Sequence, residues 1–525
     1  MTSSLIRCRP RRARSHISVR AAHTVLGSVI GVVWLMFPWM TISGQDPVPA
    51  ARAGPVAEAA APPERDETSP VDLILPLAVA AAAGVLATYA YVRRTRRART
   101  RTTPGVVSAH PPVPTPAGLE RQARTALVVA DDSVRTSEEE LAFAQARFGA
   151  EEVEPFTHAL AAARTELSAA FAIRRRYEQG VPADDAARRQ ALVGIVGRCA
   201  EAGRRLDAEA EAFDQLRAPE RGVGAALEIA EGRFRELAGR TGAAEATLAG
   251  LRARYASSAT APVLGHSEQA KDRLVFATAE LNRARRTADS GAVAQAARPL
   301  RAAEGAIAQA GVFVRGVERL SAELAEAAKL VPAALTGAEA ELATARGWGA
   351  PDASVPVGEL HARIRHADVV LAAVRHELTG APYDPLDALR RIARAVEPLG
   401  VGRAGVVPVA ARLVARSAVG GAADFVSTHR GAVGAEARTL LAEAERLLAA
   451  RNEFAAADGL ARQARESAEQ DVRVHGNPYD ATGEQAGGAA GALLGGILLG
   501  EEADGGPPAS FGGPGTRGRR RLPRG

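Results

Sequence analysis

Two glycine-containing stretches have residue types that could perform chemistry. Residues 400–405 read Gly-Val-Gly-Arg-Ala-Gly and match the G-x-G-x-x-G pattern of dinucleotide-binding loops. That loop binds a pyrophosphate when a strand precedes it and a helix N-terminus follows. The preceding LDALRRIARAVEP instead has the spacing of an amphipathic helix. Gly265-His-Ser-Glu-Gln269 is similar to a nucleophile elbow but lacks its closing glycine. We therefore predict no bound cofactor, and we interpret Ser267 as a helix N-cap.

Histidines form the remaining cluster with potential chemistry. His361, His366 and His376 are separated by five and ten residues, which does not place metal ligands on one face of a helix. Solvated histidines are the better interpretation. We predict no catalytic residue and no metal site, and therefore not an enzyme.

A long apolar run predicts a transmembrane helix. Residues 71–92 read VDLILPLAVAAAAGVLATYAYV, long enough to cross a hydrocarbon core of about 30 Å. Arginines follow it at once, and such clusters mark the cytoplasmic side of a membrane. They are Arg93, Arg94, Arg96, Arg97, Arg99 and Arg101. Residues 93–118 are then a basic and proline-rich linker. We expect the protein to be anchored in the cell (cytoplasmic) membrane, with the bulk of the chain on the cytoplasmic side.

A second apolar run lies near the N-terminus. Residues 1–42 combine several arginines with the segment TVLGSVIGVVWLMFPWMTI, as in a secretory signal. The sequence leaves open whether this is a cleaved signal peptide or an N-terminal membrane anchor. In either case residues 43–70 form a short extracytoplasmic loop rich in Ala and Pro.

Charge is distributed unevenly along the chain. Seventeen arginines lie in the N-terminal region, at 93–101 and after Gly515; without them the net charge of +6 becomes about −11. Basic clusters beside a membrane attract anionic lipid headgroups, so we predict an anionic lipid membrane as a partner. With only 4% aromatic residues, the chain lacks stacking platforms for bases, and no nucleic acid is expected.

Heptad spacing is the clearest pattern in the cytoplasmic part. Apolar residues repeat on both sides of Ala218-Pro-Glu-Arg-Gly222, and this pattern predicts two helices that pair as an antiparallel hairpin. The seam consists of Leu192, Ile195, Cys199, Leu206, Phe213, Leu227, Phe234, Leu248 and Tyr255. We interpret Cys199 as a small core residue rather than a reactive thiol.

Three further stretches resemble one another, at 279–304, 367–397 and 441–470, each with two Ala-rich helices around a short turn. Ser137-Glu-Glu-Glu140 has the form of a capping box and predicts a helix start. These patterns predict an all-α fold, with the membrane helix followed by elongated, coiled-coil-like hairpins or a bundle over residues 119–475. Residues 476–525 are rich in glycine and end in arginines, which predicts a disordered basic tail.

Several segments resemble a known family. ELAFAQARFGAEEVEPFTHALAAARTELSAAFAIRRRYEQ, IVGRCAEAGRRLDAEAEAFDQLR and the tail ASFGGPGTRGRR are similar to actinobacterial membrane proteins that contain a TPM domain. The resemblance implies a signal peptide, a membrane helix, a coiled-coil cytoplasmic region and a glycine-rich tail. It also implies an extracytoplasmic TPM domain, for which residues 43–70 are far too short.

We therefore predict a membrane-anchored, non-enzymatic helical scaffold or adaptor. Its cytoplasmic helices would bind an unknown protein partner or associate with further copies of the chain. Two alternatives stay open: a reduced TPM-family protein that has lost a phosphatase or sensor domain, and a peptide-binding module like a tetratricopeptide repeat.

Overall fold

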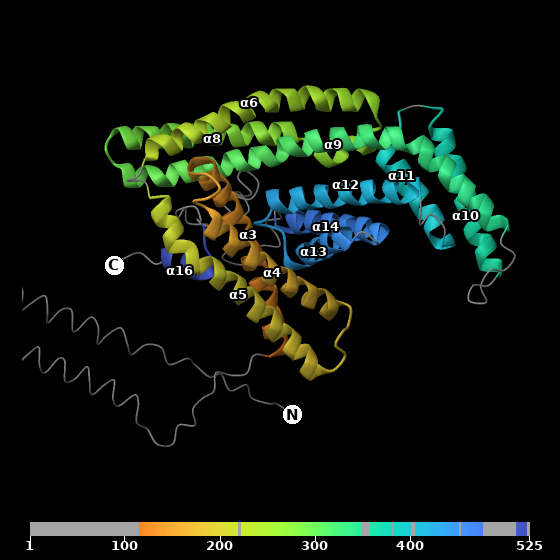
Figure 1. Ribbon diagram of the computed structural model, residues 1–525, viewed down its shortest axis with the longest axis horizontal. Helices are drawn as coiled ribbons and strands as arrows, with labels where there is room; N and C mark the ends of the chain where they lie inside the picture. The colour runs from red at the N-terminus through yellow and green to blue at the C-terminus, as the bar shows by residue number, and fades with distance from the viewer. Residues whose placement is uncertain are drawn as a thin grey trace, which may run out of the picture. The chain divides into compact units, whose positions relative to one another are not determined.

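In a computed structural model of the protein, the described residues are 115–218, 222–347, 357–380, 382–400, 405–450, 453–475 and 511–521. Every regular element in these ranges is a helix (Figure 1), so the predicted all-α fold is confirmed. The segment 1–42, the loop 43–70, the predicted transmembrane helix 71–92 and the arginines that follow it lie outside the described residues.

The longer helices follow one another along the chain with short connections. In order they are α3 (Pro116–Phe148), α4 (Glu154–Glu178), α5 (Asp185–Leu216), α6 (Val223–Arg254), α8 (His266–Asp289), α9 (Val293–Gly347), α10 (Val357–Glu377), α11 (Pro385–Val396), α12 (Val406–Thr428), α13 (Ala435–Ala450), α14 (Phe454–His475) and α16 (Pro514–Arg521). Short turns α7 (Ser257–Thr260), η2 (Ala261–Val263) and η3 (Glu397–Leu399) complete the described elements.

Helices α3, α4 and α5 form the first packed group. On α4 the buried residues recur at alternating spacings of four and three, which places one apolar stripe on the helix. These residues are Phe156, Leu160, Ala163, Leu167 and Ala170. The stripe packs against α5 and α3, and the three helices share one apolar core.

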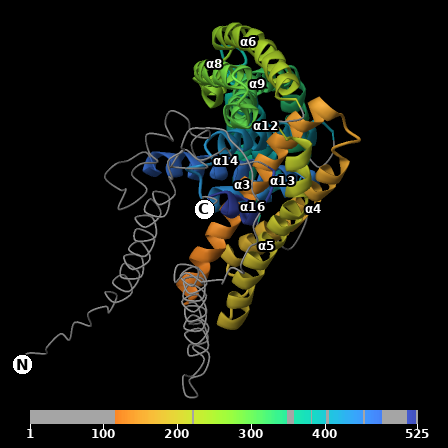
Figure 2. The ribbon, with the colours of Figure 1, turned by 90° about the vertical axis from the view of Figure 1, so that its left-hand side faces the viewer.

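The second group is built along α9. This helix has 55 residues, which corresponds to a length of about 80 Å. Helices α6 and α8 run beside it (Figures 1 and 2), and α10, α11 and α12 pack along it further on. A third, smaller core joins α12, α13 and α14. The hairpins predicted from the three similar stretches correspond to α8 with α9, α10 with α11, and α13 with α14.

Buried ion pairs connect the groups. Arg438 on α13 is 1% exposed and donates a hydrogen bond to Asp132 on α3 at 2.7 Å. Arg217, at the end of α5, pairs with Glu304 on α9 at 2.5 Å and with Glu140 on α3 at 3.2 Å. A buried charge that loses its partner is costly, so these pairs favour one relative placement of the helices.

The predicted hairpin between the two heptad helices is wrong. Helix α5 packs against α4 and α3, whereas α6 packs against α9 and α8. The residues of the proposed seam therefore lie in two separate cores. Heptad spacing places an apolar stripe on each helix, but it does not determine which helix covers that stripe.

Three local predictions also need correction. Ser137 is not an N-cap, because it lies inside α3 and is buried. That helix begins at Pro116, within the predicted linker, where the Thr115 side chain accepts a hydrogen bond from the Gly118 N–H. Helix α8 has Gly265 rather than Ser267 as its N-cap, with a left-handed conformation (φ 82°) that favours glycine.

The C-terminal tail also differs from the prediction. Residues 511–521 are folded, and they include helix α16 and the fully buried ring of Phe511. The other residues of the predicted disordered segment, 476–510 and 522–525, lie outside the described residues. A short glycine-rich sequence can be ordered when its backbone N–H groups and its one aromatic ring find partners on another element.

Helix α12 is, among the described helices, the one with the length and composition of a membrane span. In the structure it packs against α9, α11, α13 and α14. The core helices of soluble proteins can have the same apolar length, so length alone does not separate the two classes. This helix is one candidate for association with a membrane.

Candidate functional site

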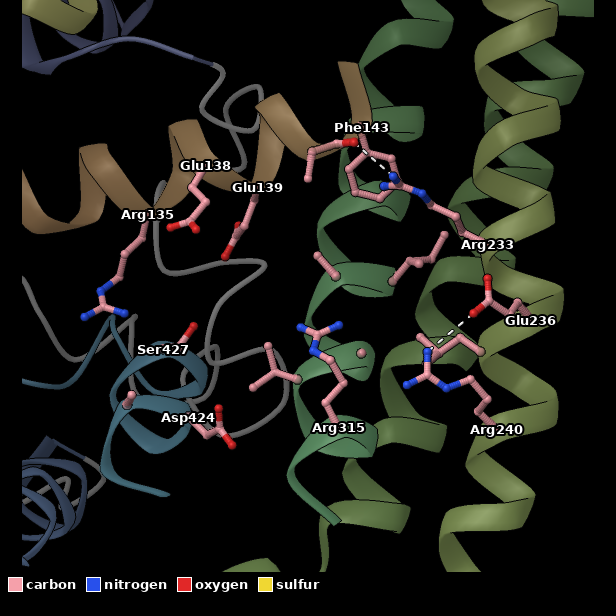
Figure 3. A pocket seen from close by; sticks show the side chains of 17 residues that line it. Arg135, Glu138, Glu139, Phe143, Arg233, Glu236, Arg240, Arg315, Asp424 and Ser427 are labelled. Carbon is pink, nitrogen blue, oxygen red and sulfur yellow. Dashed lines mark hydrogen bonds and ion pairs between the residues drawn. The ribbon is translucent and has the colours of Figure 1, made fainter. Parts of the chain in front are cut away.

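A charged cleft of about 550 Å³ lies where α3, α6, α9 and α12 approach one another (Figure 3). It is lined by arginines and carboxylates above an apolar floor. The polar lining residues are Arg135, Glu138, Glu139, Arg233, Glu236, Arg240, Arg315, Asp424 and Ser427, and the floor includes Phe143, Leu237 and Ile307.

Helical periodicity brings these side chains to the cleft. On α6, Arg233, Glu236 and Arg240 are three and four residues apart and therefore share one face. On α9, Gly311 and Arg315 are four apart, and the guanidinium group of Arg315 lies over the glycine. A Cβ on Gly311 would be 2.9 Å from Nη1 of that arginine, so a larger residue there would displace Arg315.

Each carboxylate of the cleft has an arginine partner. Glu139 accepts two hydrogen bonds from Arg430, at 2.9 and 3.3 Å. Three further pairs are Glu138 with Arg164, Glu236 with Arg240 and Asp424 with Arg319. The negative charges of the cleft are therefore compensated within the protein.

Two of the four arginines have no such partner. Arg135 pairs with Asp131 at 3.0 Å and Arg240 with Glu318 at 2.7 Å. Within the described residues, Arg233 and Arg315 have no carboxylate at salt-bridge distance. The cleft therefore contains two guanidinium groups whose charge is not compensated by a paired acid.

Arg233 is held in place by neutral groups. It donates a hydrogen bond to the carbonyl oxygen of Ala142 at 2.9 Å, and its guanidinium carbon lies 4.2 Å from the centre of the Phe143 ring. Partial burial lowers the pKa of Arg233, but arginine remains cationic in proteins. Figure 3 shows Arg233 extending from α6 toward Phe143, and Arg315 extending from α9 toward α3 and α12. Both groups retain N–H donors for a ligand.

A second cavity of about 370 Å³ shares Asp424 with the cleft and is also lined by His266, Arg319 and Arg465. Burial, followed by repulsion from Arg465, lowers the pKa of His266 to about 4. Nδ1 of this ring is buried and has no hydrogen-bond partner among the described residues. A Cβ on Gly316 would lie 3.1 Å from that nitrogen and 3.3 Å from Oδ2 of Asp424, so glycine leaves space for both groups. The arrangement holds His266 neutral at pH 7.

Acidification is expected to destabilise the protein through His266. The unfolded chain binds this proton near pH 6.5 and the folded protein only near pH 4, so stability present above pH 6.5 is lost as pH falls toward 4. Between pH 7 and 4.5, the wild type should lose about 1–2 kcal/mol more than His266→Gln, after allowance for partial exposure. Denaturant unfolding at both pH values measures the difference. Equal losses in the two proteins would contradict the prediction.

The structure separates the residues predicted for the helical seam. Leu192, Ile195, Cys199, Leu206 and Phe213 are buried in the core of α3, α4 and α5. Leu227, Leu248 and Tyr255 are buried in the core along α9, with Phe234 partly buried against it.

His361, His366 and His376 are exposed on α10, and the described residues include no group of His, Cys, Asp and Glu that could hold a metal ion. Gly400 and Gly405 lie at helix ends, as C-cap of η3 and N-cap of α12.

Sequence reasoning missed the two unpaired arginines. Their signal is weak, because a charged stripe opposite an apolar one is typical of any solvent-facing helix surface. A cleft forms only because α3, α6, α9 and α12 approach one another in the tertiary structure. Arg233 and Arg315 differ from Arg135 and Arg240 only in that the latter two form salt bridges.

The fold and the cleft define an all-helical protein with a site suited to binding an anionic group. No family model matches the chain, and no solved structure matches it. The chain is similar to UPF0603 proteins from two strains of Mycobacterium tuberculosis, each 30% identical over 420 residues. The alignment covers 75% of this chain and 63% of each relative. The chain thus spans less than two thirds of the length of these curated relatives.

Proposed function

We propose that the protein is a membrane-anchored, non-enzymatic scaffold whose helical body binds an acidic segment of a partner protein in the cleft of Figure 3. One observation carries this proposal. Every carboxylate of the cleft forms a salt bridge with an arginine, whereas Arg233 and Arg315 have no carboxylate at salt-bridge distance within the described residues. Their interactions with acids act over longer distances, from Glu304 and Glu236 on Arg233 and from Asp424 on Arg315.

The chemistry of arginine favours a carboxylate ligand. A guanidinium group presents N–H donors in a planar fork that matches the two oxygens of a carboxylate. Arg233 is half-buried, so its charge is screened less by salt than a fully exposed one. The apolar floor near Phe143 and Leu237 can cover the aliphatic part of a glutamate side chain. An acidic segment with two carboxylates fits both arginines.

Membrane attachment rests on the sequence. The predicted helix at 71–92 and the arginines at 93–101 would hold the body at the cytoplasmic surface. Tethering a binding site there raises the local concentration of its partner without any chemical step. The resemblance to TPM-domain membrane proteins is consistent with this arrangement, since it includes a membrane helix before the helical region.

Replacing both unpaired arginines should weaken binding of an acidic peptide at least tenfold. Each lost hydrogen bond between charged groups is worth about 1.5–3 kcal/mol. The test uses the full-length protein in detergent and a fluorescent hexaglutamate peptide, with anisotropy as the readout. The Arg233→Gln/Arg315→Gln double variant is compared with the wild type at one low salt concentration.

The matched control is Arg283→Gln on α8, an exposed arginine 3.6 Å from Glu280. It removes charge outside the cleft and corrects for attraction of the probe to the basic segments of the chain. Equal affinities of the double variant and Arg283→Gln would contradict the proposed site.

Crosslinking in intact cells tests the scaffold role itself. We expect a defined partner to be captured by the full-length chain, and to be lost both from the double arginine variant and from an anchor that lacks residues 119–475. Recovery of further copies of the same chain alone would contradict the adaptor role.

A further inference from the structure

The C-terminal segment Phe511-Gly-Gly-Pro-Gly-Thr516 lies in a groove formed by α3, α4 and α5, far from it in sequence. Figure 1 shows α16 beside α5. The ring of Phe511 is fully buried. It stacks on Phe213 with centroids 4.7 Å apart and meets the edge of Phe156 at 5.7 Å. An aromatic ring in such a pocket is the kind of anchor that dominates peptide recognition.

Polar contacts fix the backbone that follows this anchor. The carboxylate of Asp207 accepts hydrogen bonds from the N–H groups of Gly513 at 2.9 Å, Gly515 at 3.1 Å and Thr516 at 2.9 Å. The Thr516 hydroxyl donates to the same carboxylate at 2.6 Å. One acid on α5 thereby accepts from the N–H of Gly513, just before α16, and from the first N–H groups of that helix, which no intrahelical bond can satisfy.

The groove also selects small residues. A Cβ on Gly513 would lie 2.3 Å from the carbonyl oxygen of Gly203, and a Cβ on Gly203 would lie 2.7 Å from Cδ of Pro514. Gly512 has φ 141°, a conformation that favours glycine, and its N–H donates to the hydroxyl of buried Ser137 at 3.2 Å. The groove therefore contacts the Phe511 side chain and the backbone N–H groups of the segment, and its close packing admits only glycine at position 513.

We propose that this groove is a reversible recognition site for the segment Phe-Gly-Gly-Pro-Gly-Thr, and that a second copy of the chain can supply the segment in place of the chain's own. The contacts resemble those of a peptide with its receptor: one aromatic anchor, one carboxylate that reads backbone donors, and close backbone packing. The segment is attached through residues 476–510, which can extend to about 120 Å at most, so its release does not require the helical body to unfold.

The chain's own segment competes with any external one. A tethered ligand has an effective concentration of about 1 mM. If a free peptide binds the emptied groove with a Kd of ~10 µM, the tethered segment raises the apparent Kd about 100-fold. The full-length chain should therefore bind a free peptide poorly, and a chain without residues 511–525 should bind it well.

The first test measures binding of a fluorescent ASFGGPGTRGRR peptide to the full-length chain and to the chain that ends at Ser510, both in detergent. We expect saturable binding to the shortened chain and about 100-fold weaker binding to the full-length chain. A peptide with alanine in place of the phenylalanine should bind at least tenfold more weakly. Absence of binding to the shortened chain, with helical content unchanged by circular dichroism, would overturn the proposal. Equal binding to both chains would also overturn it.

The second test does not depend on truncation alone. Asp207→Asn in the full-length chain removes the charge that holds the segment, and should free the segment while keeping the helical body. Mixed with the chain that ends at Ser510, this variant should form a heterodimer that the free peptide disrupts. The matched control is Glu211→Gln, an exposed acid one turn further along α5, which keeps its own segment docked and should therefore associate with the shortened chain about 100-fold more weakly. Failure of the Asp207→Asn variant to form one would refute exchange between copies.

Discussion

Replacing Arg438 by leucine is expected to lower the free energy of unfolding by about 3–5 kcal/mol, because it removes the guanidinium group that pairs with Asp132 and one of the two that pair with buried Asp131. The Arg438 side chain is 1% exposed and lies between α13 and α3. It donates to Asp132 at 2.7 Å and also to Asp131. It further donates to the carbonyl oxygen of Arg430 at 2.6 Å. The Arg438 side chain therefore binds two acids of α3 and also the backbone of the segment that precedes α13.

The charge of Asp131 makes this loss large. Burial by itself would raise the pKa of that carboxyl, but Arg135 and Arg438 hold it below its usual value. The stabilisation is therefore present above about pH 4 and is lost as pH falls below it. In the variant, Asp131 keeps only Arg135, and burial already raises the pKa of Asp132.

The experiment compares unfolding midpoints of the full-length protein in detergent at pH 7. The control is Arg446→Leu on the same helix, whose arginine is largely exposed and pairs with Glu443 at 2.8 Å. An exposed pair of this kind is worth about 0–1 kcal/mol. A shift for Arg438→Leu no larger than that of the control would show that the α3–α13 contact is not formed as described.

The second large effect concerns Cys199. We expect its alkylation at pH 8 to be about 1,000-fold slower in the folded protein than for a free cysteine. Burial raises the pKa of this thiol to about 12, so the reactive thiolate is roughly 10⁻⁴ of the population at that pH, against about a fifth for an unperturbed thiol. The side chain is also 2% exposed, which restricts access of the reagent.

Iodoacetamide labelling followed by mass spectrometry measures this rate in a Cys8→Ser background. The control places a thiol on the exposed face of α5, as Ala208→Cys in a chain that also carries Cys199→Ala. Denaturant should abolish the difference. Native labelling of Cys199 within tenfold of the control would mean that the core of α3, α4 and α5 opens readily.

The helices of the described region could be predicted well from local signals. Heptad spacing identified α5 and α6 as helices, and short turns identified the pairs α8–α9, α10–α11 and α13–α14. Ala218-Pro-Glu-Arg-Gly222 marked the break after Leu216. These signals are local, because a helix satisfies its own backbone hydrogen bonds and displays its apolar stripe through a fixed period.

The sites could not be predicted in the same way. Arg233 and Arg315 belong to helices α6 and α9, and their lack of acidic partners depends on every other pair around the cleft. Ser137 has the local pattern of an N-cap, yet it lies within α3 and binds the N–H of Gly512. The residues around Ser137 in the sequence do not indicate a contact with Gly512, and the residues around Gly512 do not indicate a contact with Ser137.

By itself, the sequence determined that this region is helical, where several of its helices end and which residues form the apolar stripes of α5 and α6, since each property depends on residues within a few turns of one another. The tertiary structure alone decided that α5 pairs with α4 rather than α6, that Arg438 compensates two acids of α3, and that a glycine-rich segment docks through Phe511 and Asp207. Burial of a stripe or a charge is favourable against many surfaces. Which surface is chosen depends on the fit of shape and charge among residues that are distant in the chain.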